Sequence, residues 1–539
     1  MNLLERPINL SIVCTSEGER PHYSLAPISF KKTNLKPHDY QLIIEPNHIK
    51  QELFGIGTSF TESSAFVLSH LSNEMRLEVM NALFSKNGAN FSLCRVPIGS
   101  CDFSVEGCYS HADEPSDTSL GSFSLIHDID GFSSSDYEGV LCDSYDIIPM
   151  LKEAFTLKGD SCEDLRLIAS AWTAPPWMKD INDWYISPKK ENGYQGTGGE
   201  LLEEYFPHYS EYLCKFITEY KALGIDIWGL TIVNEPLGNN GQWESMHFSA
   251  FSQSQLIANF LGPTLLRYDL SDIKLLTFDH NRDELLDWVE VVYNDTAAER
   301  YVSGAAIHWY ESSVNVSEKI LEKVHRKFPE KIIIHTEGCI DDLGNEAPEG
   351  ILDPVGYKEK DWFQNDFFWW NKLASDWAYS ATWEHVDVDE HPMYAPVHRY
   401  AKNIILSLNH WVSGWVDWNC VLDERGGPNH VGNYCGAPIM INYRTNDIYY
   451  TPVFYILAQF SKSIRPGDVV VSSTLRNNTK TVPQLYCCVT KNSKKNLLVH
   501  VFNESVNEQS LEIVLGEWRS TYVSPANSLS SLEIHLNQH

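Results

Sequence analysis

The chain has 539 residues, of which 43% are hydrophobic and 12% are aromatic. This length is too great for one ordinary core and accommodates a barrel of about 250 residues or more beside one smaller domain. With 41 Lys and Arg against 72 Asp and Glu, the formal net charge of -31 argues against a nucleic-acid partner, because no positive surplus exists to neutralise phosphates. The same charge disfavours simple electrostatic docking on an anionic membrane.

The N-terminal segment and the cysteines give expectations about compartment and cofactors. Residues 1–23 hold no apolar stretch of signal-peptide length, and no run of about 18 apolar residues follows, so we expect neither an export leader nor a transmembrane segment. On these grounds we expect a cytoplasmic protein or one exported without a leader, with only peripheral membrane contact. The 12 cysteines show no metal-ligand spacing, so we expect mostly buried thiols, room for one or two disulfides, and no metal or organic cofactor.

In chain order, the first predicted element is a strand over residues 29–46, where apolar and polar residues alternate. Eight short β-rich runs follow, most of them separated by polar loops or by stretches with helical periodicity. They cover residues 53–60, 91–99, 165–172, 227–235, 273–280, 305–310, 331–337 and 412–419. The helical stretches include residues 74–86, 201–224, 317–328 and 397–410, and Gly224 suits a helix C-cap. This alternation predicts an α/β fold with a parallel (β/α)8 TIM barrel.

Strand-like runs return from about residue 449, and together with the N-terminal strand they predict an accessory β-sandwich. We therefore expect residues 1–52 to contribute strands to the sandwich, residues 53–448 to form the barrel, and residues 449–539 to complete the sandwich. We expect the sandwich to cover and solubilise the barrel rather than to bind a ligand.

Polar and aromatic residues close or closely follow the predicted barrel strands. These residues are Asp102, Trp172, Glu235, His280, Tyr310, Glu337 and Trp418. The carboxyl ends of the strands in such a barrel meet at one face, where barrel enzymes keep their chemistry, so we expect these side chains to lie together. A random set of strands would scatter them.

Glu235 and Glu337 end the fourth and seventh predicted strands, within TIVNEP and IIIHTEG. They are 337 − 235 = 102 residues apart, which is three βα units of roughly 31 residues each, so both should face one cavity. Two carboxyl groups about 5–5.5 Å apart across a glycosidic bond perform hydrolysis with retention, one as nucleophile and the other as acid/base. We assign Glu235 as acid/base and Glu337 as nucleophile, although a single glutamate at a strand end is more often structural.

Four further residues are candidates for supporting this pair. Asn234 precedes the acid/base and can hydrogen-bond the 2-hydroxyl of a sugar. Arg95, in RVP on the second strand, is placed to keep Glu337 ionised by charge-assisted hydrogen bonding, although a buried structural arginine would look the same. Tyr310 and His308 could steady Glu337 similarly, and a core histidine is at least as good an interpretation of His308.

A set of sequence blocks spans most of the chain, from FGIGTSFTESSA through RVPIGSCDFS, ASAWTAPPWMK, VNEP, LGPTLL, AIHWY and HTEGC to GWVDWN and GGPNHVGN. In this order they resemble glycoside hydrolase family 30, and within it the acid β-glucosidases called glucosylceramidases. The resemblance implies Glu235 as acid/base and Glu337 as nucleophile, in agreement with the assignment from the residues. It also implies a glucose pocket contacted by Asp102, Trp172, Asn234, Trp418 and, more weakly, Asn433. A carboxylate suits paired hydroxyls, and an indole offers an apolar face and one N–H donor.

The resemblance further implies a glucosylated lipid substrate at a membrane surface, cleavage of glucosylceramide to glucose and ceramide, an activator protein, and a secreted or lysosome-like setting. The sequence departs from the mammalian-type pattern of these glucosylceramidases in two places. The N-terminal segment keeps only Cys14 where the pattern is Cys-rich, which argues against extracellular disulfides and secretion. A longer connection between Cys339 and Trp415 includes the aromatic segment 361–383, for which both packing of an inserted helix and a lipid-facing role are open.

Two kinds of alternative function stay open at this point. Another activity of the same family, such as a β-1,6-glucanase, β-glucosidase or β-xylosidase, is one, because loops select the aglycone and their specificity does not follow from the sequence. A non-catalytic carbohydrate- or lipid-binding barrel is the other. The presence of both glutamates counts against a binding module, which has no need of a second, differently tuned carboxyl group.

Overall fold

The computed structural model describes residues 7–24, 30–32, 38–159, 165–312, 315–340, 362–364, 366–370, 395–479 and 481–536. Eight parallel strands form a barrel within them: β4 (Gly55–Gly57), β5 (Leu93–Ile98), β6 (Arg166–Ala171), β7 (Gly229–Thr231), β8 (Lys274–Asn281), β9 (Val302–His308), β10 (Ile332–Glu337) and β11 (Val412–Val416). Their spatial order is β4-β11-β10-β9-β8-β7-β6-β5. The ring closes where Ser59 pairs with Arg95, whose N–H donates to the Thr58 carbonyl oxygen (3.2 Å). The predicted TIM barrel is confirmed.

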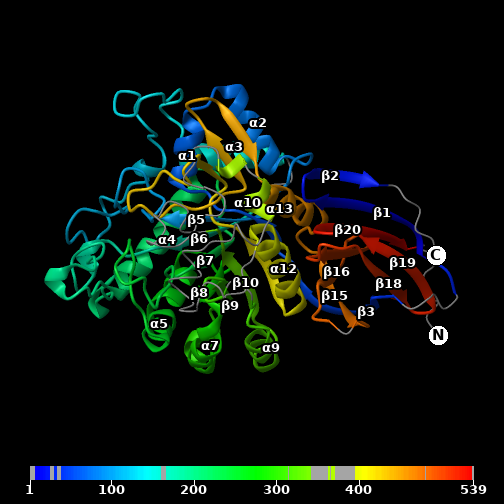
Figure 1. The fold of residues 1–539 in the computed structure, drawn as a ribbon. Coiled ribbons are helices and arrows are strands. Elements are labelled where there is room, and N and C mark those ends of the chain that lie inside the picture. Colours follow the sequence, from blue (N-terminus) through cyan, green and yellow to red (C-terminus); the bar gives the residue numbers. More distant parts are fainter. Residues whose placement is uncertain are drawn as a thin grey trace.

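Helices surround this barrel (Figure 1). The predicted helices correspond to α2 (Asn73–Phe84), α4 (Phe206–Ala222), α9 (Glu318–Lys327) and α12 (Pro396–Asn409). Helix α4 begins later than predicted, because Leu201 pairs with Lys179 in an isolated bridge and Pro207 opens the helix. Gly224 follows α4 at φ 83°, the left-handed conformation expected of a C-cap glycine. Further helices are α1 (Glu62–Ser69), α3 (Ile147–Lys158), α5 (Ala250–Leu256), α6 (Gly262–Arg267), α7 (Leu285–Asn294), α8 (Thr296–Glu299), α10 (Asp366–Trp370) and α13 (Pro452–Ser463).

A second, nine-stranded sheet unites the two ends of the chain. Its strands are β1 (Pro7–Ser16), β2 (Glu19–Ser24), β3 (Tyr40–Glu52), β15 (Val469–Asn477), β16 (Leu485–Lys491), β17 (Leu497–Asn503), β18 (Gln509–Leu515), β19 (Trp518–Ser524) and β20 (Ser528–Leu536). Their order is β19-β18-β3-β15-β16-β17-β20-β1-β2, so N-terminal strands lie between or beside C-terminal ones. The sheet encloses its own core, which includes Leu42, Val499 and Ile513. The accessory β-domain built from both ends is confirmed, while its exact boundaries stay a prediction.

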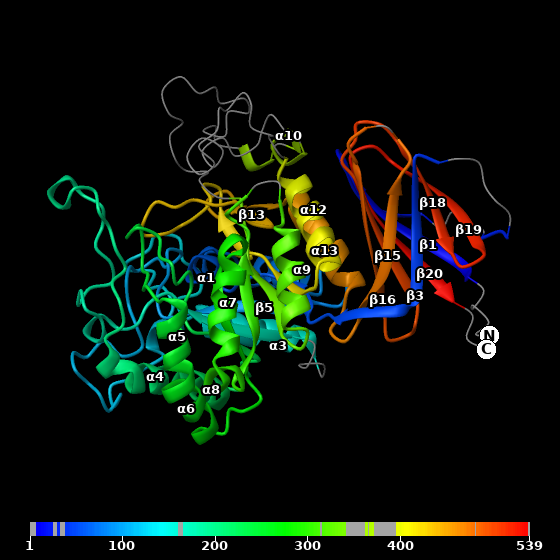
Figure 2. The ribbon, with the colours of Figure 1, turned by 90° about the horizontal axis from the view of Figure 1, so that it is seen from below.

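Helices α12 and α13 lie between the barrel and this sheet (Figure 2). Gln459 on α13 bonds with the sheet at several points: its Nε2 donates to the carbonyl oxygens of Val13 (3.2 Å) and Leu529 (3.1 Å), and its Oε1 accepts from Thr15 Oγ1 (2.7 Å). A small sheet of β12 (Val421–Asp423), β13 (Ile439–Asn442) and β14 (Asp447–Tyr450) follows β11. None of the described helices is long and apolar enough to cross a membrane.

The aromatic segment predicted near the barrel mouth is described at residues 362–364 and 366–370, and the rest of it lies outside the described residues. Trp369 and Trp370 on α10 are 1% and 3% exposed. Trp369 Nε1 donates to the Phe363 carbonyl oxygen (2.8 Å). For these two tryptophans the packing interpretation therefore holds, because a lipid-facing ring would be exposed.

Candidate active site

Glu235 lies just beyond β7, where the backbone leaves the barrel wall. The strand pairs with its neighbours over Gly229–Thr231, shorter than the predicted 227–235. Asn234 N–H donates to the Ala171 carbonyl oxygen (2.6 Å), and Glu235 N–H donates to that of Asp279 (3.0 Å). Glu235 has φ 50°, a left-handed conformation that costs a non-glycine residue about 1–3 kcal/mol and persists only where the surroundings fix it.

Glu337 is the last residue of β10 and is buried. A carboxylate oxygen of Glu337, one of Glu235 and a ring nitrogen of His308 all lie within 4.8 Å of one another. The two glutamates, 102 residues apart in sequence, thus face one space at the carboxyl ends of the strands.

Arg95 on β5 lies beneath this space and contacts several of the predicted residues. Its Nη1 donates to Glu337 Oε2. Its Nη2 donates to Asn234 Oδ1 (2.8 Å) and to Asp279 Oδ2 (2.8 Å). Its guanidinium carbon is 4.7 Å from the centre of the Trp172 ring. The buried guanidinium therefore orients the Asn234 amide and one carboxylate oxygen of Glu337 at the same time.

Tyr310 contributes the second contact to Glu337. Its hydroxyl donates to Glu337 Oε1 (3.0 Å), while its N–H donates to Asn281 Oδ1 (3.0 Å). Both carboxylate oxygens of Glu337 therefore accept a hydrogen bond, one from Arg95 and one from Tyr310. Such contacts favour the charged form of a carboxyl group.

Asp279 is a functional candidate that the sequence analysis missed. It is fully buried, and its oxygens accept from Arg95, from Thr231 Oγ1 (2.6 Å) and from Thr336 Oγ1 (2.6 Å). Burial opposes its ionisation, but Arg95, His308 and Thr231 hold its pKa well below the ordinary value. Asp279 is therefore a permanent anion under the site.

His308 bridges Asp279 and Glu235. Its Nε2 is 3.1 Å from Asp279 Oδ1 and its Nδ1 is 3.2 Å from Glu235 Oε1. The sequence predicts contact of His308 with Glu337, but the ring nitrogens of His308 face these other two carboxylates. Burial lowers the pKa of His308, yet the charge of Glu337 and the hydrogen bonds to Asp279 and Glu235 raise it to about 9. The imidazole thus holds a proton next to Glu235 at neutral pH.

Burial alone would raise the pKa of both glutamates, but the groups around them differ. At Glu235, the hydrogen bond to His308 and the charges of His280 and His308 outweigh burial, so the pKa is lowered. At Glu337, burial and the charge of Glu235 outweigh His308 and Arg95, so the pKa is raised. Arg95 opposes protonation of Glu337, as the sequence analysis expected, but burial prevails. The proton that serves Glu235 therefore resides on His308.

The residues predicted to hold a sugar also lie together. Asn433 Nδ2 donates to Asp102 Oδ2 (2.9 Å). Trp172 and Trp418 stack with ring centres 5.1 Å apart, and both lie over Arg95. Burial and the charge of Glu337 raise the pKa of Asp102 well above its ordinary value, so this carboxyl group can both donate and accept.

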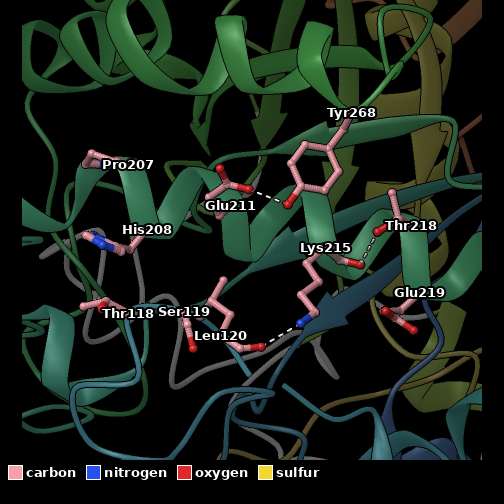
Figure 3. A pocket seen from close by; sticks show the side chains of 10 residues that line it. All are labelled: Thr118, Ser119, Leu120, Pro207, His208, Glu211, Lys215, Thr218, Glu219 and Tyr268. Atoms are coloured by element: carbon pink, nitrogen blue, oxygen red, sulfur yellow. Dashed lines mark hydrogen bonds between the residues drawn. The ribbon is translucent and has the colours of Figure 1, made fainter. Parts of the chain in front are cut away.

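A hollow of about 490 Å³ lies elsewhere, beside helix α4, and none of the predicted site residues lines it (Figure 3). Two of its polar side chains bond with neighbouring groups: Lys215 Nζ donates to the Leu120 carbonyl oxygen (2.6 Å), and the Tyr268 hydroxyl donates to Glu211, whereas His208 Nδ1 is buried without a hydrogen-bond partner among the described residues. Groups satisfied in this way give no indication of a ligand.

The chain is similar in sequence and fold to known proteins. Residues 53–348 and 360–464 match the sequence profile of the glycosyl hydrolase family 30 TIM-barrel domain. The lysosomal acid glucosylceramidase of Mus musculus is 29% identical over 468 residues, which are 86% of this chain and 78% of that protein. The endo-1,6-beta-D-glucanase neg1 of Aspergillus fumigatus is 26% identical over 431 residues, 79% of this chain and 73% of that protein. Among solved structures, SrfJ from Salmonella typhimurium shares the fold, with a TM-score of 0.77 at 23% identity over 98% of this chain and 100% of that chain. The chain belongs to glycosyl hydrolase family 30 and is a glycoside hydrolase.

Proposed function

We propose that the protein hydrolyses the β-glucosyl bond of glucosylceramide with retention of configuration, releasing glucose and ceramide. The observation that carries this proposal is the approach of Glu235 and Glu337 oxygens to within 4.8 Å. Retaining glycosidases keep their carboxyl groups about 5–5.5 Å apart, whereas inverting enzymes need about 6.5–9.5 Å to admit a water molecule. The short separation supports double displacement.

In the first step, the Glu337 carboxylate attacks the anomeric carbon while Glu235 protonates the departing oxygen. A covalent glucosyl ester on Glu337 forms and the aglycone leaves. In the second step, Glu235 removes a proton from water, which attacks the same carbon, and glucose leaves with its original configuration. Arg95 and Tyr310, which donate to Glu337, stabilise its carboxylate before attack and as it departs.

His308 supplies the proton that Glu235 needs. The imidazole is held by the anion Asp279 on one side and lies 3.2 Å from Glu235 Oε1 on the other. Proton transfer across this contact gives neutral histidine, whose Nε2–H still donates to Asp279, and a protonated Glu235. One proton is thereby shared by the pair over a wide pH range.

The proposed sugar contacts fit a terminal glucose. Asn234 Oδ1 accepts from Arg95, which leaves the amide nitrogen to donate to the 2-hydroxyl. Asp102 and Asn433 offer paired polar atoms, and Trp172 and Trp418 offer indole surface. The deep burial of Asp102, Trp172, Asn234 and Trp418 supports binding of one sugar at a chain end rather than an open cleft.

The aglycone separates the two leading candidates. The name of the mouse relative supports a lipid glucoside as substrate and a secreted or lysosome-like setting. Presentation of the lipid at a membrane surface and an activator protein are further proposals, which rest on the family resemblance alone. The name of the Aspergillus fumigatus relative supports β-1,6-glucan cleavage instead. Glucose release from glucosylceramide in mixed micelles, compared with release from a β-1,6-linked glucan, decides between them. Greater turnover of the lipid is expected, and the reverse result would favour the glucanase.

Two further observations test the mechanism and the alternative of a binding module. Proton NMR of the first-formed glucose should show the β-anomer, and the α-anomer would exclude retention. Folded protein that cleaves no β-glucoside, β-xyloside or glucan between acidic and alkaline pH would instead support a non-catalytic binding barrel.

A further inference from the structure

Three side chains with metal-ligand chemistry meet outside the group built around Glu235 and Glu337. Cys108 lies in the connection after β5, Glu244 in the connection after β7, and His430 in the connection after β12. One ligand atom from each lies within 4.8 Å of the other two. His430 Nε2 is 3.2 Å from Glu244 Oε2 and 3.7 Å from Cys108 Sγ.

The hydrogen bonding of His430 makes Nε2 its metal-binding atom. Its Nδ1 lies 2.9 Å from the carbonyl oxygen of Ser104, which can only accept, so Nδ1 carries the hydrogen. The lone pair of the neutral ring is then on Nε2, which faces the thiol and the carboxylate. A carbonyl that holds the other ring nitrogen in this way is usual for metal-bound histidines.

Glu244 provides the negative charge. It is fully buried, and among the described residues neither carboxylate oxygen has a hydrogen-bond partner of good geometry. The nearby ammonium group of Lys179 donates to the carbonyl oxygens of Trp184 (2.7 Å) and Ser245 (3.0 Å). A buried ionised carboxylate is costly without a cation beside it. A metal ion bound between Glu244 and His430 would supply this positive charge.

We propose that Cys108, Glu244 and His430 bind a zinc ion with one open coordination position. At zinc bond lengths of about 2.0–2.3 Å, tetrahedral ligand atoms lie roughly 3.4–3.6 Å apart, close to the two separations found here. The thiolate and carboxylate together neutralise the dication, and sulfur and nitrogen ligands favour zinc over calcium or magnesium, which prefer oxygen. The connections that hold Cys108 and His430 also carry Asp102 and Asn433, so the ion ties together two sides of the proposed sugar site.

Cobalt titration of the full-length protein tests this site without reference to activity. Protein stripped with a chelator and dialysed is titrated with Co²⁺, and absorbance is followed in the near-ultraviolet, where thiolate-to-cobalt charge transfer appears. We expect one equivalent of cobalt to bind and to show this band, and one equivalent of zinc to displace it. Cys108→Ser should lose the band and bind zinc at least about tenfold more weakly. Cys142→Ser removes the other half-buried thiol of the described residues and should leave both unchanged.

Three results would overturn the proposal. The first is that the folded protein binds no metal. The second is a cobalt complex without the thiolate band, because the ion would then lie at carboxylates such as Glu235 and Glu337. The third is that both cysteine variants lose the band equally. If Cys108→Ser does not fold, Glu244→Gln decides the matter, since it keeps the side-chain volume and removes the charge. Zinc affinity about tenfold lower in Glu244→Gln supports the site, and unchanged affinity refutes it.

Discussion

Replacing His308 with glutamine should move the alkaline limit of activity to lower pH. The His308 pKa of about 9, against an ordinary value near 6.5, corresponds to roughly 3 kcal/mol in favour of the proton held between Asp279 and Glu235. Glutamine keeps hydrogen-bonding capacity toward both carboxylates but cannot carry this proton. If the alkaline limit falls from about pH 9 by two pH units, the fraction of enzyme that holds the catalytic proton at pH 8 drops about tenfold.

The assay is kcat/KM for an alkyl β-glucoside, a poor leaving group that needs protonation, measured from acidic to alkaline pH. A dinitrophenyl β-glucoside, which needs little protonation, is the matched control and should lose far less activity in His308→Gln. In the wild type the acid limit should lie above the ordinary glutamate value near 4.5, because the pKa of Glu337 is raised and its carboxylate must be ionised to attack. An identical alkaline limit in wild type and variant would refute the shared-proton mechanism.

The same histidine predicts a pH-dependent stability. Its pKa is higher in the folded than in the unfolded chain, so its stabilising contribution is full below about pH 6.5 and is lost as pH rises through about 9. Urea unfolding of the wild type and of His308→Gln should therefore differ more at pH 6 than at pH 10. A constant difference between the two would show that the folded protein does not hold the proton.

The remaining predictions concern other buried residues of the barrel. Glu337→Gln should abolish turnover, whereas Glu235→Gln should spare slow cleavage of substrates with good leaving groups; full activity in the first variant would remove the assignment. Asp279→Asn removes the buried anion that Arg95 and His308 both contact and should lower the free energy of unfolding by about 3–5 kcal/mol, while Asp102→Asn, whose carboxyl group is held neutral, should cost much less in the same denaturant titration. Trp369→Ser should destabilise the fold by about 3–5 kcal/mol and reduce turnover of lipid and soluble glucosides in equal proportion; a selective loss on lipid would revive the lipid-facing role.

Hydrophobic patterning predicted the barrel because its strands are buried on both faces and are short. The eight predicted runs overlap β4 to β11, and the gathering of Glu235 and Glu337 follows from their places at the ends of the fourth and seventh strands. What patterning could not supply was the partner of each side chain. His308 was placed beside Glu337, yet its nitrogens contact Glu235 and Asp279, a choice set by ring orientation and not by strand position.

Asp279 escaped prediction because the two-residue alternation of strands fails at that point. The register between β8 and β9 shifts between Phe278 and His280, and Phe278 and Asp279 both have left-handed backbone (φ 76° and 69°). The sequence pattern therefore favoured His280 as the polar residue at the strand end. The cluster of Cys108, Glu244 and His430 escaped for another reason: its members are 136 and 186 residues apart, from 244 − 108 and 430 − 244, far outside any local metal-ligand spacing.

These left-handed residues also explain how the site is assembled. Local conformational preference disfavours them, so each must be fixed by the fold around it. The Glu235 N–H donates to the Asp279 carbonyl oxygen, while the Asp279 side chain is held by Arg95, Thr231 and Thr336. The two irregular strand ends therefore support each other, and the proposed acid/base depends on its buried anionic neighbour for backbone position as well as for charge. Loss of the Asp279 carboxylate should consequently disturb the placement of Glu235 even where His308 is still able to hold a proton.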